Sequence, residues 1–252
     1  GTGVWRVGPF RDPSSSGDGL EHGCFRANKG ETIAVIGATG SGKTTLVSLA
    51  AGFYDATEGQ VLIDGQDVRS YSFDALYDRI GYVTQRAIVF AGDVRSNVLF
   101  GESGAPQDDE SVQRALSLAQ ATEFVDKLPG KLDAPIAQAG ANVSGGQKQR
   151  LSIARALARK PEILIFDDSF SALDYRTDAS LRAGLARELS DTTCLIVAQR
   201  IGTIRHADRI VVLDEGRVAG IGTHDALMKN CGVYREIAMS QLSAAELEKE
   251  GV

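Results

Sequence analysis

The sequence predicts an α/β fold, in which a largely parallel sheet carries an antiparallel β edge and is interrupted by an inserted helical segment. Residues 32–36 (TIAVI) are almost wholly apolar, which predicts a strand buried on both faces. A glycine-rich turn follows this run and leads into a predicted helix at about residues 43–51. Two more short apolar runs, 163–166 and 194–197, lie on either side of a polar helix at about 175–189. Between residues 87 and 158, apolar residues recur at helical spacing and strand signals are few.

Turn signals predict the antiparallel edge. Residues 59–65 alternate like an exposed strand and end in an Asp-Gly turn, and residues 209–222 form two apolar runs around Asp214-Glu215-Gly216, which predicts a hairpin. We therefore expect a core made of residues 1–86 and 159–232, a helical subdomain at 87–158 and a charged C-terminal helix at 233–252.

Composition sets limits on the class of protein. The 252 residues are 43% hydrophobic and 24% charged, which is typical of a globular chain able to bury a full core. With 27 basic and 33 acidic residues, the net charge of −6 argues against nucleic acid as a partner. No apolar run approaches the about 18 residues that span a bilayer. We expect this stretch to be soluble and, since it opens with Gly1 rather than Met, to be part of a longer chain.

Residues 37–44 (GATGSGKT) carry the strongest motif, a match to GxxxxGK[ST] between a buried strand and a helix. Glycines let backbone amides wrap a β-phosphate, and the helix N-terminus adds its positive end. We expect Lys43 to reach the β- and γ-phosphates and Thr44 to bind Mg²⁺; a glycine turn without a ligand is the alternative. The residues expected at the nucleotide here are Gly37, Ala38, Thr39, Gly40, Ser41, Gly42, Lys43, Thr44 and Thr45.

Two carboxylates follow the apolar run at 163–166. A carboxylate at the end of a strand beside a phosphate loop holds Mg²⁺ directly or through water. Asp167 is therefore the expected metal ligand, with Asp168 directly after it. An Asp that caps the following turn is the alternative.

A third motif, Ser144-Gly145-Gly146-Gln147, follows Val143 and precedes a basic stretch and a helix expected at 151–158. A hydroxyl and glycine amides at a helix N-terminus can hold a γ-phosphate, and a plain N-cap by Ser144 is the alternative. The order of phosphate loop, this segment and the strand ending in Asp167 resembles the ABC ATPases.

The resemblance implies a P-loop NTPase core of the RecA-like type that binds ATP and Mg²⁺. In that family the signature segment contacts the ATP of the opposite subunit, so that two domains sandwich two nucleotides. Gln85 resembles the Q-loop glutamine, which lies near the metal, and residues 171–174, ending in Asp174, resemble the D-loop. Residues 137–140, and 90–100 with Asn97, resemble segments of exporters, the second packing under the coupling helices of a transmembrane domain. The specific resemblance is to the nucleotide-binding domain of a multidrug or lipid ABC exporter. The resemblance implies that the domain lies at the cytoplasmic face of the plasma membrane, as part of the full transporter.

Two positions depart from the family pattern. Asp168 stands where hydrolytic members have Glu, and Gln199 stands where the switch residue is His. Asp has a pKa similar to that of Glu but a shorter reach, and Gln cannot become cationic. His206 and His224 do not have the switch spacing, and we interpret both as loop residues. The pattern resembles the degenerate subunit of a heterodimeric exporter, whose near-intact signature, with Val143 in place of Leu, completes the partner's competent site.

Other interpretations remain open. A slow homodimer could still use Asp168, and the chain could be a non-transport ABC ATPase of DNA repair or translation, or a nucleotide sensor without turnover. Exporters stack adenine on an aromatic residue about 25 positions before the phosphate loop, where this chain has Asp12, with Phe10 or Trp5 as substitutes. The cysteines Cys24, Cys194 and Cys231 have no metal spacing and predict reduced structural thiols in a cytosolic protein.

Overall fold

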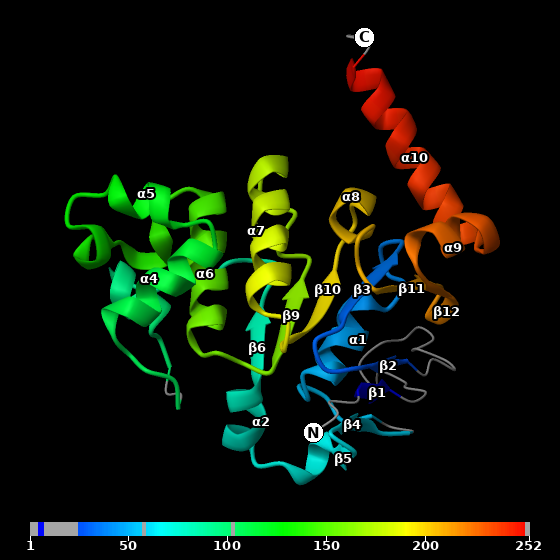
Figure 1. Cartoon of the computed structure of the whole chain (residues 1–252), viewed down its shortest axis with the longest axis horizontal. Coiled ribbons are helices and arrows are strands. Elements are labelled where there is room, and N and C mark those ends of the chain that lie inside the picture. Colours follow the sequence, from blue (N-terminus) through cyan, green and yellow to red (C-terminus); the bar gives the residue numbers. More distant parts are fainter. Residues whose placement is uncertain (1–4, 8–24, 57–58, 102–103, 250–252) are drawn as a thin grey trace. The chain divides into compact units, whose positions relative to one another are not determined.

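The computed structural model describes residues 5–7, 25–56, 59–101 and 104–249. The chain divides into two compact units, one made of Gly1–Ser72 and Thr193–Val252 and the other of Phe73–Thr192. Figure 1 shows the elements of both. The subdomain boundaries expected at residues 86/87 and 158/159 stay a prediction.

The first unit is built on four strands in the order β12-β11-β3-β10. β3 (Thr32–Gly37) runs parallel to both β10 (Thr193–Val197) and β11 (Arg209–Asp214), and β12 (Arg217–Gly222) is antiparallel to β11. The central residues of β3, β10 and β11 are buried, which explains their unbroken apolar runs. The hairpin turn places Glu215 and Gly216 at φ 45° and 77°, as a type I′ turn requires.

A second, antiparallel sheet in this unit has the order β2-β1-β4-β5. Its strands are β1 (Trp5–Val7), β2 (Arg26–Ala27), β4 (Val61–Ile63) and β5 (Gln66–Asp67). β4 is shorter than the strand expected at 59–65, and it turns at Asp64 and Gly65, with φ values of 53° and 80°. A short 3₁₀ turn, Val68–Ser70, follows. The expected antiparallel edge is thus present.

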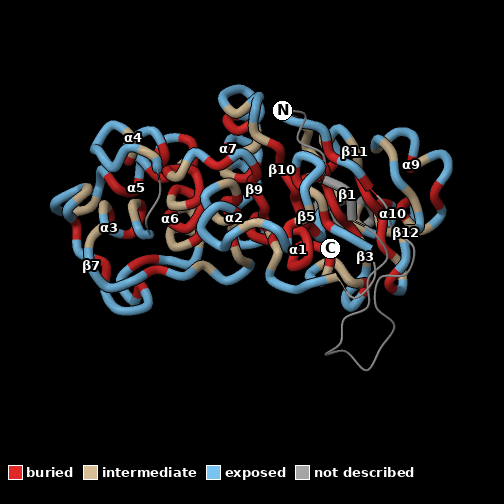
Figure 2. Tube along the Cα trace, turned by 90° about the horizontal axis from the view of Figure 1, so that it is seen from below, coloured by how far each residue is buried: buried red, intermediate tan, exposed pale blue. Residues whose placement is uncertain are grey.

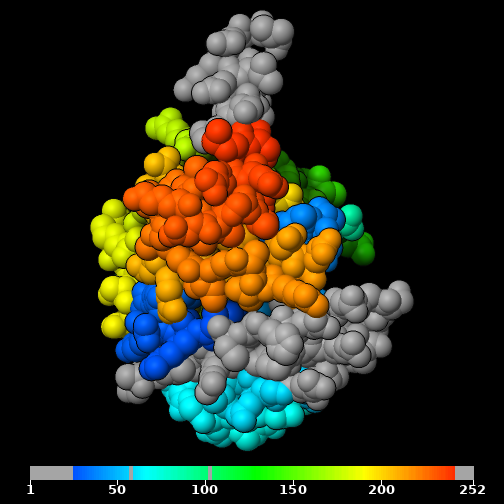
Figure 3. All heavy atoms as spheres, turned by 90° about the vertical axis from the view of Figure 1, so that its right-hand side faces the viewer, coloured from blue at the N-terminus to red at the C-terminus, as the bar shows by residue number. Residues whose placement is uncertain are grey.

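Four α-helices belong to the described part of the first unit. α1 (Lys43–Ala50) follows β3, α8 (Ile201–Ile204) follows β10, and α9 (His224–Asn230) and α10 (Gly232–Lys249) follow β12. α9 packs on β12, and α10 packs on α9, β11 and α8. Figure 3 shows β11 to α10, orange to red, as one continuous surface.

The second unit contains two parallel strands, β6 (Ile80–Val83) and β9 (Ile163–Asp167), with Tyr82 opposite Ile165. α2 (Phe73–Arg79) leads into β6, and α7 (Tyr175–Glu188) follows β9. Both predicted buried runs, 163–166 and 194–197, are strands, and the mixed α/β class is confirmed.

The predicted helical insertion contains the remaining elements of this unit. They are β7 (Gly92–Asp93), α3 (Val94–Val98), α4 (Asp109–Leu118), α5 (Thr122–Asp126), β8 (Pro135–Ile136), α6 (Gly145–Ala158) and the 3₁₀ turns Lys131–Asp133 and Gln138–Gly140. α6 packs on α3 and α4, and it is largely buried (Figure 2). The helix expected at 151–158 begins six residues earlier, because Ser144 caps it.

Two interpretations of single residues need comment. His206 lies in a turn, as expected, but His224 is wrong as a loop residue, since it opens α9 with its Nδ1 2.8 Å from the Tyr234 hydroxyl. Cys194 and Cys231 are buried free thiols, and burial raises the pKa of Cys194 to about 12. Across the described ranges, no helix is long and apolar enough to cross a bilayer.

Candidate functional site

The phosphate loop joins β3 to α1 in a conformation that glycine alone adopts readily. Gly40 and Gly42 have φ values of 82° and 94°, in the left-handed region. At Gly37 the reason is steric, since an added Cβ would collide with the Leu213 carbonyl oxygen of the neighbouring strand. Among the described residues, no side chain caps the N-terminus of α1. Its first backbone N–H groups are therefore available to an external anion.

Lys43 is held over this loop by its own backbone. Its Nζ donates to the carbonyl oxygens of Gly37 and Ala38, at 2.8 and 2.6 Å, and lies 3.5 Å from Ser41 Oγ. Thr44, the expected metal ligand, is exposed at the start of α1. The loop thus offers an ammonium, a hydroxyl and a helix N-terminus on one short segment. This donor set fits the phosphates of a nucleotide and one face of a Mg²⁺ ion.

Asp167 ends β9 and accepts a hydrogen bond from the Tyr82 hydroxyl at 2.9 Å. Burial and the nearby Asp167 raise the pKa of Tyr82, so the phenol stays protonated and donates. Within the described residues no group of three or more His, Cys, Asp or Glu could hold a metal. Mg²⁺ characteristically takes one or two carboxylates together with substrate phosphates, and Asp167 fits that role.

Asp168 has an unusual backbone for a non-glycine residue, with φ at 47°. Asp and Asn tolerate this left-handed region better than other side chains. Its buried carboxylate accepts from Gln85 Nε2 at 3.2 Å, and its carbonyl oxygen accepts from Ser171 Oγ at 2.7 Å. The next side chain, Ser169, is fully buried, and its Oγ has no hydrogen-bond partner in the described part of the chain. The structure thus brings Gln85 and Asp168 together.

The signature segment forms a capping box at the start of α6. Gln147 N–H donates to Ser144 Oγ at 3.3 Å, and Ser144 N–H donates to Gln147 Oε1 at 2.8 Å. The plain N-cap weighed from the sequence is therefore present. Ser144 and Gly145 are nevertheless exposed, and a Cβ built on Gly145 meets no described atom within 4 Å. The space in front of this N-terminus is open to a ligand.

α6 also holds the segment that contains Gln85. Gln149, buried on α6, donates through Nε2 to the Thr84 carbonyl oxygen at 3.2 Å. Arg150 donates to the Gln120 carbonyl oxygen at 2.8 Å and lies over the Phe124 ring. One helix therefore fixes both the signature and the residue before Gln85.

Arg155 is a functional candidate that the sequence did not single out. Its guanidinium donates to the carbonyl oxygens of Ile88 and Asn97, at 2.7 and 2.8 Å, and to Asn97 Oδ1 at 3.1 Å. It lies 5.0 Å from the Phe90 ring centroid and 5.5 Å from that of Phe100. Burial lowers its pKa to about 10. The available signal was its place one turn beyond Leu151 on the helix after the signature.

Arg155 supports an exposed apolar surface made of Ile88, Phe90 and Phe100. These three side chains are 54%, 37% and 51% exposed, and the two rings stack with centroids 4.1 Å apart. Asn97, almost fully buried, accepts from Phe90 N–H at 2.8 Å and holds the run in place. This surface lies within the run at 90–100 that resembles exporters, extended by Ile88.

The remaining predicted residues lie at ends of elements. Gln199 is exposed between β10 and α8 in the first unit. In the second unit, Asp174 caps α7, accepting from Thr177 N–H at 2.9 Å, and Val143 is buried before the signature. Asp12 and Phe10 lie outside the described residues, as does the side chain of Trp5.

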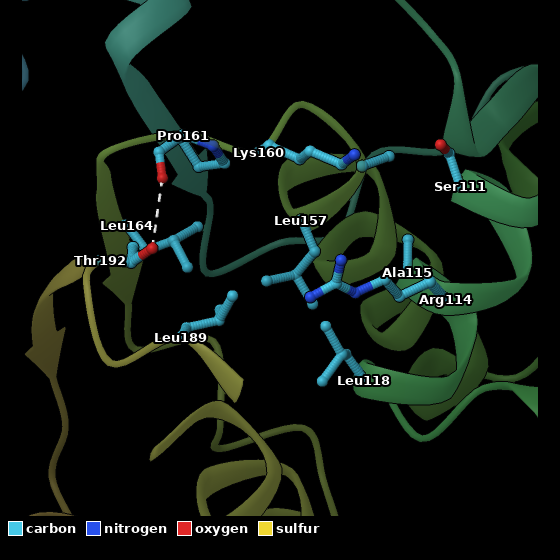
Figure 4. Close-up of a pocket in the computed structure, with 11 residues that line it drawn as sticks. Ser111, Arg114, Ala115, Leu118, Leu157, Lys160, Pro161, Leu164, Leu189 and Thr192 are labelled. Atoms are coloured by element: carbon cyan, nitrogen blue, oxygen red, sulfur yellow. Dashed lines mark hydrogen bonds between the residues drawn. The ribbon is translucent and has the colours of Figure 1, made fainter. Parts of the chain in front are cut away.

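A separate cavity of about 190 Å³ lies in the second unit, and it contains none of the predicted site residues. Leu118, Leu157 and Leu164 form its apolar wall, and Arg114 and Lys160 lie at its polar side (Figure 4). Thr192 Oγ1 donates to the Pro161 carbonyl oxygen across one edge, at 3.4 Å.

Comparisons with known proteins identify the family of this chain. A family model described as ABC transporter matches residues 20–171. An uncharacterized ABC transporter ATP-binding protein of Mycobacterium tuberculosis is 43% identical over 249 residues, which are 97% of this chain and 42% of that protein. A Staphylococcus aureus protein named for multidrug export, as an ATP-binding/permease protein, is 43% identical over 209 residues, covering 83% of this chain and 36% of its own length.

A solved structure of a bacterial Atm1-family ABC exporter with ATP bound superposes with a TM-score of 0.89 at 34% identity, covering 96% of this chain and 42% of that one. The chain thus spans about two fifths of the length of the M. tuberculosis protein and of the Atm1-family exporter, and somewhat less of the S. aureus protein. The resemblance to an exporter nucleotide-binding domain is confirmed, while the degenerate site stays a prediction. Because the family model covers more than half of the chain, the chain belongs to the ABC transporter family, as an ATP-binding domain of the exporter type.

Proposed function

We propose that the chain is the ATP-binding motor of a heterodimeric exporter and that it carries the poorly hydrolysing site. It binds Mg-ATP through residues 37–45 and Asp167, and pairs head to tail with a different nucleotide-binding domain. It then offers its own signature to the partner's nucleotide. Bound Mg²⁺ supplies positive charge to the β- and γ-phosphate oxygens.

Asp168 is the observation that carries the proposal. Its carboxylate is one methylene shorter than that of Glu, which withdraws it by roughly 1.5 Å, and catalysis tolerates such a displacement poorly. The carboxylate is also engaged by Gln85 Nε2 rather than directed to solvent. Its left-handed backbone suits Asp better than Glu, so the residue is matched to this geometry. Gln199 is the second departure that weakens hydrolysis at this site, because glutamine, unlike the usual histidine, cannot become positively charged.

The signature supports a role in the other site. Ser144 caps α6 while staying exposed, and Gly145 leaves the helix N-terminus clear. A hydroxyl and uncovered backbone amides at that position suit the γ-phosphate of a nucleotide bound by the opposite domain.

A transmembrane partner is supported by the apolar surface of Ile88, Phe90 and Phe100. An exposed aromatic pair held from behind by Arg155 and Asn97 suits a short apolar helix that needs a firm contact. We propose that this surface receives the coupling helices of the exporter's transmembrane domain. Movement there would reach the signature through α6, which contains Arg155 and begins directly after its N-cap, Ser144.

The decisive experiment compares two variants in the reconstituted pair of subunits. Ser144→Arg fills the anion pocket of the competent site with a bulky side chain, so we expect most ATPase activity to disappear. Asp168→Ala changes the site that already hydrolyses poorly, so much of the activity should remain. Steady-state ATP hydrolysis in membranes or nanodiscs measures both.

The reverse ranking would show that the two sites are assigned to the wrong subunits. The slow homodimer makes a different prediction, because both its sites would use Asp168. A tight, ATP-bound complex of the chain with itself that turns over quickly, seen by light scattering and phosphate release, would refute the heterodimer.

A further inference from the structure

The switch residue Gln199 is followed at once by a short helix whose first N–H groups need acceptors. α8 begins at Ile201, two residues after Gln199, and Arg200 at its N-cap position makes no side-chain capping bond. The first N–H groups of any helix have no partner within the helix. An acceptor from elsewhere is therefore needed to hold this start in place.

Gln241, on α10, supplies that acceptor and a donor as well. Its Oε1 accepts from the Ile201 backbone N–H at 2.8 Å, and its Nε2 donates to the Gln199 carbonyl oxygen at 2.6 Å. Both ends of one amide thus bond to the backbone on either side of Arg200. The amide of Gln carries a neutral donor and an acceptor on one planar group, and Gln241 lies 40 residues after Ile201 in the sequence.

The contact lies within the first unit and between elements that pack on each other. α10 packs on α8 and on β11, and Gln241 is half-buried in this interface. The bonded backbone is that of the switch residue itself. A shift of α10 would therefore pull on the carbonyl of Gln199 directly.

We infer that Gln241 is a positioning residue, which sets the backbone of the switch segment so that the Gln199 side chain is directed toward the γ-phosphate. Through this contact, the position of α10 affects the geometry of the nucleotide site. The inference rests on the proposed role of Gln199 at the nucleotide for its functional half, while the two backbone contacts stand independently.

The first test measures amide hydrogen exchange at residues 199–204 of the purified chain without nucleotide. Gln241→Met keeps the size of the side chain and removes both bonds, so exchange of the Ile201 amide should rise about tenfold. Gln241→Glu keeps an acceptor for Ile201 but loses the donor to Gln199, and its exchange should be intermediate. Gln113→Met, the same change at an exposed site on α4, should leave this segment unchanged.

The second test measures the affinities for Mg-ATP and Mg-ADP by calorimetry. Gln241→Met should weaken ATP binding several-fold and leave ADP binding as it was, as should Gln199→Ala, because only ATP has the γ-phosphate. Gln113→Met should bind both nucleotides like the parent.

The two tests fail separately. Parental exchange of the Ile201 amide in Gln241→Met would overturn the positioning contact itself. If Gln199→Ala keeps the parental ratio of ATP to ADP affinity, the proposed role of Gln199 fails, whatever the exchange data show. If Gln199→Ala loses discrimination and Gln241→Met exchanges faster but keeps it, the backbone contact does not direct the side chain and the inference is overturned.

Discussion

Gly145→Ala should separate the stability of α6 from the function of its N-terminus. Gly145 is the first residue of α6, its backbone needs no left-handed angle, and the added Cβ would meet no described atom within 4 Å. A methyl group at this position therefore makes no steric clash with the described part of the chain. Any loss of function must come from what approaches this exposed position from outside.

The substitution should raise the free energy of unfolding and lower the rate of ATP turnover. Alanine in place of glycine in a helix stabilises by about 0.5–1 kcal/mol, so the free energy of unfolding should rise by about 0.5 kcal/mol at this first position. If a γ-phosphate of the partner's nucleotide must reach these amides, the methyl group holds it away. Loss of a preorganised donor to a transition-state anion costs about 100- to 1,000-fold in kcat, and partial loss should still lower turnover by about tenfold or more.

Gly184→Ala is the matched control. Gly184 lies inside α7, it also has open space at its Cβ position, and it belongs to no motif. Urea unfolding should show stabilisation in both variants, while ATP hydrolysis by the reconstituted pair should fall only in Gly145→Ala. If Gly145→Ala hydrolyses ATP like the parent, the open face of α6 does not receive a phosphate, and the reasoning about the signature is refuted.

Three further outcomes are expected. Lys43→Ala should lose a charge-assisted phosphate contact worth about 1.5–3 kcal/mol, and equal ATP affinity by calorimetry would contradict the assignment. Asp168→Glu alone should restore little single-turnover hydrolysis, since Glu fits the left-handed backbone less well, and adding Gln199→His should restore more, because residues of one catalytic unit are not additive. Full recovery from the single change, with the partner's catalytic carboxylate disabled, would show that Gln199 is a competent switch. Arg155→Met should lower the free energy of unfolding by about 2–4 kcal/mol, and a change below about 1 kcal/mol in urea would refute its supporting role.

Local patterns predicted most of the fold. The buried runs at 32–36, 163–166 and 194–197 are strands because strands covered on both faces have no polar side to display, and the two type I′ turns follow from Asp-Gly and Glu-Gly pairs. The start of α6 could also have been predicted, since Ser144 and Gln147 have the spacing of a capping box. The helical pattern alone instead predicts a start at Leu151.

Contacts between distant segments could not be predicted from one sequence. Arg155 is one of several arginines on a helix, and nothing local shows that it lies under Phe90 and Phe100. The sequence around Gln241 contains no motif that singles it out. Its hydrogen bonds to Gln199 and Ile201 depend on the packing of α10 against α8. The backbone angle of Asp168 likewise depends on the turn closed by Ser171, rather than on its neighbours in an apolar strand.

The hydrogen bonds of Lys43 to its own loop bear on what happens when a nucleotide leaves the site. Its ammonium already has two acceptors on its own loop, the carbonyl oxygens of Gly37 and Ala38. A departing nucleotide therefore leaves no unpaired positive charge behind, and leaving such a charge in a partly buried place would be costly. Within the loop, the Lys43 side chain can therefore return to these two acceptors when a nucleotide leaves, so the ammonium stays paired in an empty loop.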